Sequence, residues 1–321
     1  MEKYAADVPL SDLQAASAVI AQHLRPTPLV PVELPGFDAP LFLKLETLQP
    51  TGSFKVRGAL AAAAAYRSTA AHLVTASAGN HGLGIAYASA TLRVKATVFA
   101  PRSAPAPKVE GMRRLGVDLR LVGEGYDEAE LAAIAYAEET GAAFVSAYAD
   151  PHVIAGQATV VGEVAAVLEG PFQIVVPVGG GGLAAGTALG AAGLDRDVRV
   201  VGVEADASLA VSVAMAAGRV VEVPVHPTLA DGLAGNLDPR ASTPELLRAH
   251  RVDVLAVTEA EIAGAIRRLL YTSGVLTEGS GAVGVAAVVA GRIRADLPTV
   301  LVITGRNIAR ERLLEVLGAG R

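Results

Sequence analysis

Short runs rich in β-branched residues alternate with alanine-rich stretches along most of the chain, and this alternation limits the fold more than any other feature. Runs at 72–76, 96–100 and 118–122 precede stretches of helical character at 82–90, 106–115 and 127–140. Further strands are expected at 174–178, 198–204, 254–257 and 300–304, with helices at 182–192, 259–273 and 281–290. Repetition of this kind is typical of βαβ units. We therefore predict an α/β protein whose mostly parallel sheets are covered by helices on both faces.

The chain of 321 residues is about twice as long as a typical domain, which favours two α/β lobes with a cleft between them. Asp150-Pro151 interrupts the pattern after the run near Phe144, so a crossing between the lobes is expected close to 148–151. The turn at 169–171 is a weaker candidate, because it can also separate a helix from the next strand.

Composition and charge exclude several classes of partner. With 27 Lys and Arg against 32 Asp and Glu, the net charge is −5, which offers no basic surface for nucleic acid. No apolar stretch approaches the roughly 18 residues that cross a bilayer, so no membrane segment is expected. The chain contains no cysteine, and its first ten residues carry Glu2, Lys3 and Asp7 without an apolar run. Both features favour a cytoplasmic protein without a secretory signal.

A lysine between apolar neighbours stands at an expected helix start, in the segment TGSFKVRGAL. Lys55 lies between Phe54 and Val56. Partial desolvation lowers the pKa of such an amine and frees it for Schiff-base chemistry. The alternative is an exposed lysine on the first turn of a helix.

The segment TASAGNHGLG follows an expected strand and leads into a helix. Ser77, Gly79 and Asn80 would present hydrogen-bond donors at the helix N-terminus, where a carboxylate is bound favourably. The alternative is a simple helix cap with His81 on the surface.

Four consecutive glycines, Gly179–Gly182, lie between a strand and a helix. Without Cβ atoms, their backbone N–H groups can converge on a phosphate, which the helix dipole also favours. The same segment fits the dinucleotide pattern GxGxxA at Gly179, Gly181 and Ala184, and Glu204 ends the next strand where a ribose-binding acid would lie. An NAD-dependent oxidoreductase is therefore a rival hypothesis, and a two-lobed amino-acid-binding protein is a third.

The last expected strand ends at Thr304, whose hydroxyl could bond a ring nitrogen or cap a helix. The motifs GxSxG, HExxH and GxxxxGK[ST] are absent, and the six histidines have no metal-ligand spacing. We predict no bound metal.

In this order, TGSFKVRGAL, SAGNHG, VIAGQAT, VPVGGGGL, TLADG and the final strand and turn resemble the fold-type II pyridoxal-phosphate (PLP) enzymes. The threonine/serine dehydratases and serine racemases are the most similar group, and the resemblance runs from about Thr27 to Asn307. It implies a two-lobed fold like that of the tryptophan synthase β chain. The large PLP-binding domain would comprise 1–45 and 151–321, and a smaller mobile domain 46–150. A homodimer or homotetramer is also implied.

The resemblance assigns a role to each matching residue. Lys55 would be the Schiff-base lysine with Phe54 beside the cofactor ring, Asn80 would bond the ring's 3′ oxygen, and Thr304 would meet the pyridine nitrogen. The 5′-phosphate would be held by Gly179, Gly180, Gly181, Gly182 and Leu183. The substrate would be bound by Ser77, Ala78, Gly79, Asn80, His81 and Glu278.

The implied activity is dehydration of an L-3-hydroxy amino acid, threonine or serine, to a 2-keto acid and ammonia by α,β-elimination. Replacement chemistry like that of threonine synthase, dehydration of 3-hydroxyaspartate, and racemisation are alternatives within the family. Ala78 stands where racemases carry an acid/base serine, which favours elimination. Arg306 stands where the family commonly has glycine. Ala210 replaces the second carboxylate of the racemase metal site near Glu204, so that metal is not expected.

Overall fold

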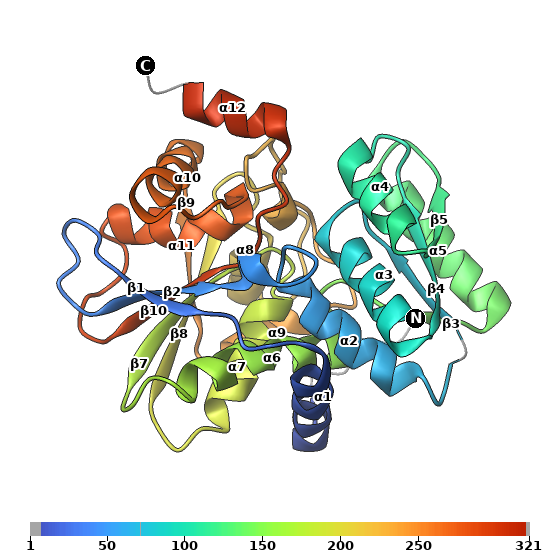
Figure 1. Ribbon diagram of the computed structural model, residues 1–321, viewed down its shortest axis with the longest axis horizontal. Helices are drawn as coiled ribbons and strands as arrows, with labels where there is room; N and C mark the ends of the chain where they lie inside the picture. The colour runs from blue at the N-terminus through green and yellow to red at the C-terminus, as the bar shows by residue number, and fades with distance from the viewer. Residues whose placement is uncertain (1–7, 71, 319–321) are drawn as a thin grey trace.

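The computed structural model describes residues 8–70 and 72–318 and consists of two sheets, each packed with helices in its own lobe (Figure 1). Residues 1–7, where we expect no secretory signal, lie outside the described residues. Among the described residues, no helix has the length and apolar composition needed to cross a membrane.

The larger sheet has six strands in the order β1-β2-β10-β7-β8-β9. Only the pairing of β1 with β2 is antiparallel. Its strands are β1 (Leu29–Val32), β2 (Leu41–Leu45), β7 (Phe172–Pro177), β8 (Val198–Ala205), β9 (Asp253–Val257) and β10 (Thr299–Ile303). Its lobe contains the helices α1 (Leu10–His23), α6 (Pro151–Ala165), α7 (Gly182–Ala192), α8 (Ala210–Ala217), α9 (Thr243–Ala249), α10 (Glu259–Ser273), α11 (Gly279–Val289) and α12 (Arg310–Gly318), and the short turns η1 (Glu46–Leu48) and η2 (Asp231–Leu233).

Both faces of this sheet are buried. Along β7, Ile174 and Val176 pack into the core shared with α6 and α7, whereas Val175 packs into the core shared with α10 and α11. Successive side chains of a strand point to opposite faces, so a strand covered on both sides needs apolar residues at every position. This explains why β7 is nearly all apolar, and its one polar residue, Gln173, is buried with its amide donating to Thr299 at 3.1 Å.

The smaller sheet is fully parallel, in the order β5-β4-β3-β6. Its strands are β3 (His72–Ala76), β4 (Lys95–Ala100), β5 (Asp118–Leu121) and β6 (Ala143–Phe144), and the helices packed with it are α2 (Lys55–Tyr66), α3 (Asn80–Leu92), α4 (Ala106–Arg114) and α5 (Tyr126–Thr140). The predicted α/β class, the parallel sheets and the strand and helix positions are confirmed within a few residues. The alternation does not reveal β1, β2 or α6.

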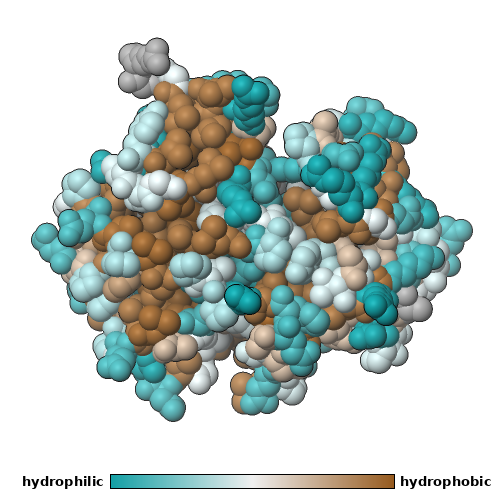
Figure 2. Space-filling model, in the orientation of Figure 1, coloured by the Kyte–Doolittle hydropathy of each residue, from teal (hydrophilic) through white to brown (hydrophobic). Residues whose placement is uncertain are grey.

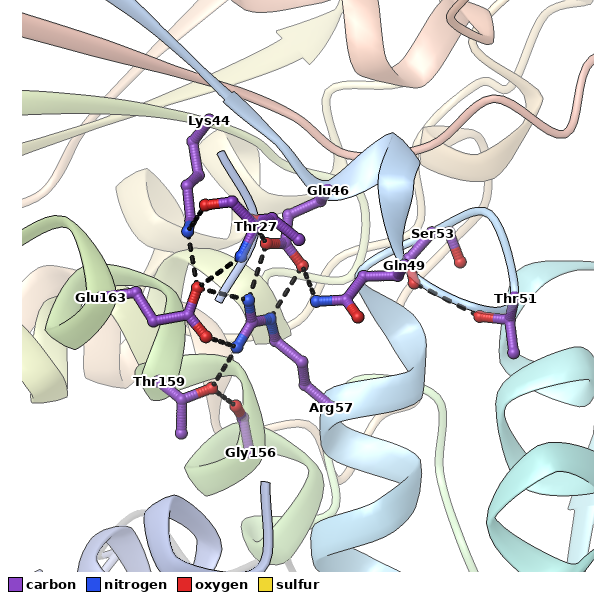
Figure 3. Close-up of polar contacts among 10 residues, drawn as sticks. All are labelled: Thr27, Lys44, Glu46, Gln49, Thr51, Ser53, Arg57, Gly156, Thr159 and Glu163. Carbon is purple, nitrogen blue, oxygen red and sulfur yellow. Dashed lines mark hydrogen bonds and ion pairs between the residues drawn. The ribbon is translucent and has the colours of Figure 1, made fainter. Parts of the chain in front are cut away.

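A buried cluster of charges joins the two lobes beneath α2 (Figure 3). The guanidinium of Arg57 donates to Glu46 at 2.7 and 2.8 Å and to Glu163 of α6 at 2.6 and 2.8 Å. Lys44 of β2 donates to the same Glu163 at 2.5 Å and to the backbone carbonyl of Thr27 at 2.7 Å. Two cations thus face two carboxylates, and the cluster links β2, η1, α2 and α6.

The charges of this cluster stabilise one another. Burial alone would raise the pKa of Glu46, but the Arg57 guanidinium, the Thr27 hydroxyl and the Lys44 ammonium together hold that pKa below its usual value. Burial lowers the pKa of Lys44, while Glu163 acts against this shift. Both Arg57 and Glu46 are fully buried. Removing either one would leave an unpaired buried charge and strongly lower the stability of the fold.

Helices α2 and α6 cross with almost no space between their backbones. A Cβ on Gly156 of α6 would lie 2.6 Å from the Cα of Gly58 and 2.7 Å from the carbonyl oxygen of Arg57. The close approach places Arg57 within reach of α6, and it requires glycine at both positions of the crossing.

We expect Gly156→Ala to lower the free energy of unfolding by about 1–3 kcal/mol, because the added methyl group would force α2 and α6 apart. Gly162→Ala on the same helix is the matched control, since a Cβ there meets nothing within 4 Å. It should leave stability unchanged or raise it by about 0.5–1 kcal/mol. Denaturant unfolding of the two variants, followed by circular dichroism, measures the difference. Equal stabilities would contradict the close packing.

Candidate active site

Lys55 is the first residue of α2, and the segment before it is attached to the end of β10. Ser53 and Gly305 form an isolated β-bridge, and the backbone N–H of Phe54 donates to the carbonyl oxygen of Thr304 at 3.0 Å. These contacts bring the predicted lysine, its aromatic neighbour and the predicted ring-nitrogen residue to one place.

The amine of Lys55 has no carboxylate partner within ion-pair distance among the described residues. Its Nζ donates to the backbone carbonyl of Ala147 at 2.8 Å and lies 5.2 Å from the ring centre of Phe54. Burial lowers the pKa of Lys55 to about 8, and the negative charge of Glu278 acts in the opposite sense. The predicted desolvated lysine is therefore present, and it is not an exposed residue of a surface helix.

The glycine loop lies against the same 147–148 turn. A Cβ on Gly180 would overlap the ring of Tyr148, and Gly181 has a φ of +84°, so both positions favour glycine. The hydroxyl of Thr243 donates to the carbonyl of Gly180 at 2.6 Å. Within the described part of the chain, no backbone carbonyl or side chain accepts a hydrogen bond from the N–H groups of 180–183. These donors are left for an anion at the start of α7.

Asn80 begins α3 and connects three segments. Its Nδ2 donates to Oε1 of Glu278 at 2.7 Å, and its Oδ1 accepts from Nδ2 of Asn307 at 2.7 Å. Burial raises the pKa of Glu278 to about 7, and the positive charge of Lys108 opposes this shift. Sequence reasoning selects Asn80 and Glu278 separately but does not predict that they pair.

The alternative interpretation of this loop, a simple helix cap with His81 on the surface, is wrong about the position of His81. His81 is 3% exposed, its Nε2 lies 3.4 Å from the carbonyl oxygen of Val145, and burial lowers its pKa to about 3. The helix cap is Gly79, whose N–H donates to the hydroxyl of Ser77 at 3.1 Å. Ser77 is thus engaged inside the loop, while Ala78 between them carries no polar group.

The final turn contains the cation that departs from the family pattern. The guanidinium of Arg306 donates to the carbonyl oxygen of Thr47 in η1, so it is tied to the lobe of the larger sheet. Thr304 is 2% exposed and follows β10 directly. Arg306 therefore reinforces the attachment of the turn and has a structural partner of its own.

These residues fit a phosphate, an aldehyde and a pyridine ring. The free N–H groups at 180–183 suit the phosphate, and the desolvated Lys55 suits the aldehyde. Nearby polar atoms that are buried without a protein partner are Ser53 Oγ, His81 Nδ1 and Ser280 Oγ. Buried polar atoms normally have partners, and a bound polar group could supply the partners that these three lack.

Glu204 does not suit the dinucleotide hypothesis. Its carboxylate is 1% exposed and accepts from the backbone N–H groups of Val211 at 2.8 Å and Ser212 at 3.3 Å, at the start of α8. A ribose-binding acid would have to face a ligand. Among residues 8–70 and 72–318, no three His, Asp or Glu side chains form a cluster that could hold a metal ion.

Several residues of this region are not apparent from the sequence. Tyr148 and Thr243 shape the glycine loop, and Nζ of Lys108 on α4 lies 3.7 Å from Asp231 of η2, an ion pair from one lobe to the other. In the sequence, these residues are polar side chains close to turns. Most loops share that pattern, so it does not single them out.

Known proteins support the assignment that this geometry favours. A family model described as pyridoxal-phosphate dependent enzyme matches residues 20–305. The L-threonine ammonia-lyases of Thermotoga maritima and Geobacter sulfurreducens are 38% and 39% identical, and each alignment covers 98% of this chain and 79% of the relative.

Solved structures give the same answer. Maize serine racemase matches with a TM-score of 0.87 and 29% identity over 98% of both chains. The threonine deaminase of T.th. matches with a TM-score of 0.83 and 37% identity over 94% of this chain and 98% of the other. The fold-type II prediction is confirmed and the NAD-dependent alternative is wrong. The chain belongs to the family of pyridoxal-phosphate dependent enzymes.

Proposed function

We propose that this enzyme is an ammonia-lyase that converts L-threonine or L-serine to a 2-keto acid and ammonia. Water is lost in the elimination and regained when the product enamine hydrolyses. The observation that carries the proposal is the half-buried amine of Lys55, which has no carboxylate partner among the described residues and a lowered pKa. The names of the two ammonia-lyase relatives favour threonine.

When bound, PLP supplies an electron sink that makes the Cα proton of an amino acid acidic. Lys55 then takes this proton, because its lowered pKa of about 8 leaves a useful neutral fraction near neutral pH. The free N–H groups at the start of α3 hold the substrate carboxylate. Glu278, with a pKa raised to about 7, holds a proton that can pass to the departing β-hydroxyl.

We also propose the contacts to the cofactor. These contacts are supported by the convergence of the residues around Lys55. Phe54 would lie beside the ring, Asn80 at the 3′ oxygen and Thr304 at the ring nitrogen, and the N–H groups of 179–183 would bind the phosphate. Substrate contacts to 77–81 are supported by the start of α3 in that loop.

We also propose the domain division at 45/46 and 150/151, which the membership of the strands in two separate sheets supports, with η1, which contacts β10, lying at the first boundary. A homodimer or homotetramer is supported by the hydrophobic surface that Figure 2 shows over the larger lobe, and by the exposure of Val30, Tyr271, Leu276 and Leu314, which belong to that lobe. Sedimentation velocity would measure the assembly. A cytoplasmic location is supported by the absence of cysteine.

Lys55→Ala should lower keto-acid release from L-threonine and L-serine by at least about a thousandfold, because the lysine is both the cofactor anchor and the base. Lys95→Ala is the matched control, because Lys95 is exposed at the start of β4. Keto acid is measured as its hydrazone, and thermal midpoints check folding. Deamination that persists in Lys55→Ala would refute the assignment.

The rate at which apoenzyme takes up PLP covalently should rise with pH around a midpoint near 8, because the neutral amine is the nucleophile. At pH 7 about a tenth of such lysines is neutral, against about one in three thousand for an ordinary lysine. Glu278→Gln should lower the midpoint, since it removes the charge that favours the ammonium form. Stopped-flow absorbance gives the profile, and a midpoint at the usual 10.5 would contradict burial of the amine.

Ala78 predicts elimination without racemisation, because a methyl group cannot return a proton to the face opposite Lys55. Chiral chromatography of L-serine incubated with the enzyme should show keto acid and negligible D-serine. Ala78→Ser should raise D-serine formation, whereas Ala78→Gly, which adds no hydroxyl, should not. D-serine formed by the unaltered enzyme as fast as keto acid would exclude this interpretation.

A further inference from the structure

Asn307 lies in the turn after β10 and is hydrogen-bonded to two other segments. Its Nδ2 donates to the backbone carbonyl of Thr51 at 2.9 Å and to Oδ1 of Asn80 at 2.7 Å. A Cβ on Gly52 would lie 2.5 Å from Oδ1 of Asn307, so the amide packs directly on a residue that must be glycine. Gly52 also has a φ of +74°, which glycine adopts without strain. The side chain of Asn307 is therefore closely confined.

The chemistry of these contacts fixes the orientation of two amides in series. A backbone carbonyl can only accept, so the NH₂ group of Asn307 must face Thr51. The same NH₂ group faces Asn80, which must turn its carbonyl oxygen toward Asn307. Consequently the NH₂ group of Asn80 is directed away from Asn307, where it donates to Glu278 at 2.7 Å.

We propose that Asn307 is a positioning residue that holds Asn80 with an N–H donor directed toward the 3′ oxygen of PLP. The NH₂ group of Asn80 has two N–H bonds, of which Glu278 takes one, and the second is left for the cofactor. A donor at this oxygen stabilises its ionised form, which absorbs in the visible, over the protonated form, which absorbs in the near ultraviolet. This inference rests on the proposed placement of PLP beside Lys55.

Asn307→Asp tests the orientation with almost no change in size. The introduced carboxylate can only accept, so it draws the NH₂ group of Asn80 toward itself and turns the carbonyl oxygen of Asn80 toward Glu278 and the cofactor. An acceptor then faces the 3′ oxygen. Asn307→Leu removes the donor without adding an acceptor, so Asn80 loses its fixed orientation but is not forced to turn.

The experiment records the absorbance spectrum of each holoenzyme before any amino acid is added. Asn307→Asp should lower the ratio of the visible band to the near-ultraviolet band by about tenfold, the value of one charge-assisted hydrogen bond, and Asn307→Leu should lower it less. Asn236→Asp is the matched control. Asn236 is exposed and bonds the backbone of Val223, so its spectrum should equal that of the unaltered enzyme.

Two further measurements separate the outcomes. Thermal midpoints of the apoenzymes and dissociation constants for PLP report general disruption, and the band ratio is compared only for protein saturated with PLP. If Asn307→Asp does not retain PLP, the ratio of the visible to the near-ultraviolet band in Asn307→Leu tests the role of Asn307 instead. An unchanged ratio at full occupancy overturns the role of Asn307 alone. An unaltered enzyme that forms no visible band with PLP overturns the proposed cofactor site itself.

Discussion

The ion pairs of Arg57 beneath α2 are the interaction on which the rest of the site depends. Arg57 is two residues beyond Lys55, and its two carboxylate partners belong to η1 and α6. These ion pairs are almost completely buried from solvent. A shift of α2 would therefore separate buried charges, at a cost of several kcal/mol. The glycine contact between α2 and α6 acts in the same direction, because it leaves the backbones only one close arrangement. The amine of Lys55 is thereby held in place by groups that lie outside the proposed contacts to PLP.

The two lobes meet through apolar contacts of α2 with α1 and α6, and also through polar contacts at the start of α3. Asn80 at the start of α3 bonds Glu278 from the larger lobe, and Lys108 pairs with Asp231 across the same space. The first contact is between groups that would touch the cofactor or the substrate, whereas the second is more exposed, with 67% of the Asp231 side chain accessible. Polar contacts between the lobes thus lie both at the proposed site and beside it.

Sequence patterns predict the structural elements and motifs that are formed by residues close together in the chain. The β-branched runs identify β7 and β10, and TGSFKVRGAL, SAGNHG and the glycine loop identify the residues around Lys55, because each motif is contiguous. Strands β1 and β2 are less apparent, since β1 is only partly buried and does not alternate with a helix. The contact of His81 with Val145 and the packing of Tyr148 on Gly180 join residues far apart in sequence. Periodicity carries no information about such contacts, so they appear only in the folded chain.

The attachment of Ser53 and Phe54 to Gly305 and Thr304 also bears on the order in which the enzyme is made. During synthesis, Lys55 leaves the ribosome about 250 residues before the strand that completes its surroundings, so for most of translation the lysine has no β10 beside it. The smaller sheet, whose strands all lie between 72 and 144, can form well before that point. At the proposed site, cofactor capture would therefore be a late event of biogenesis, and a chain truncated before β10 would carry Lys55 without the strand end beside it.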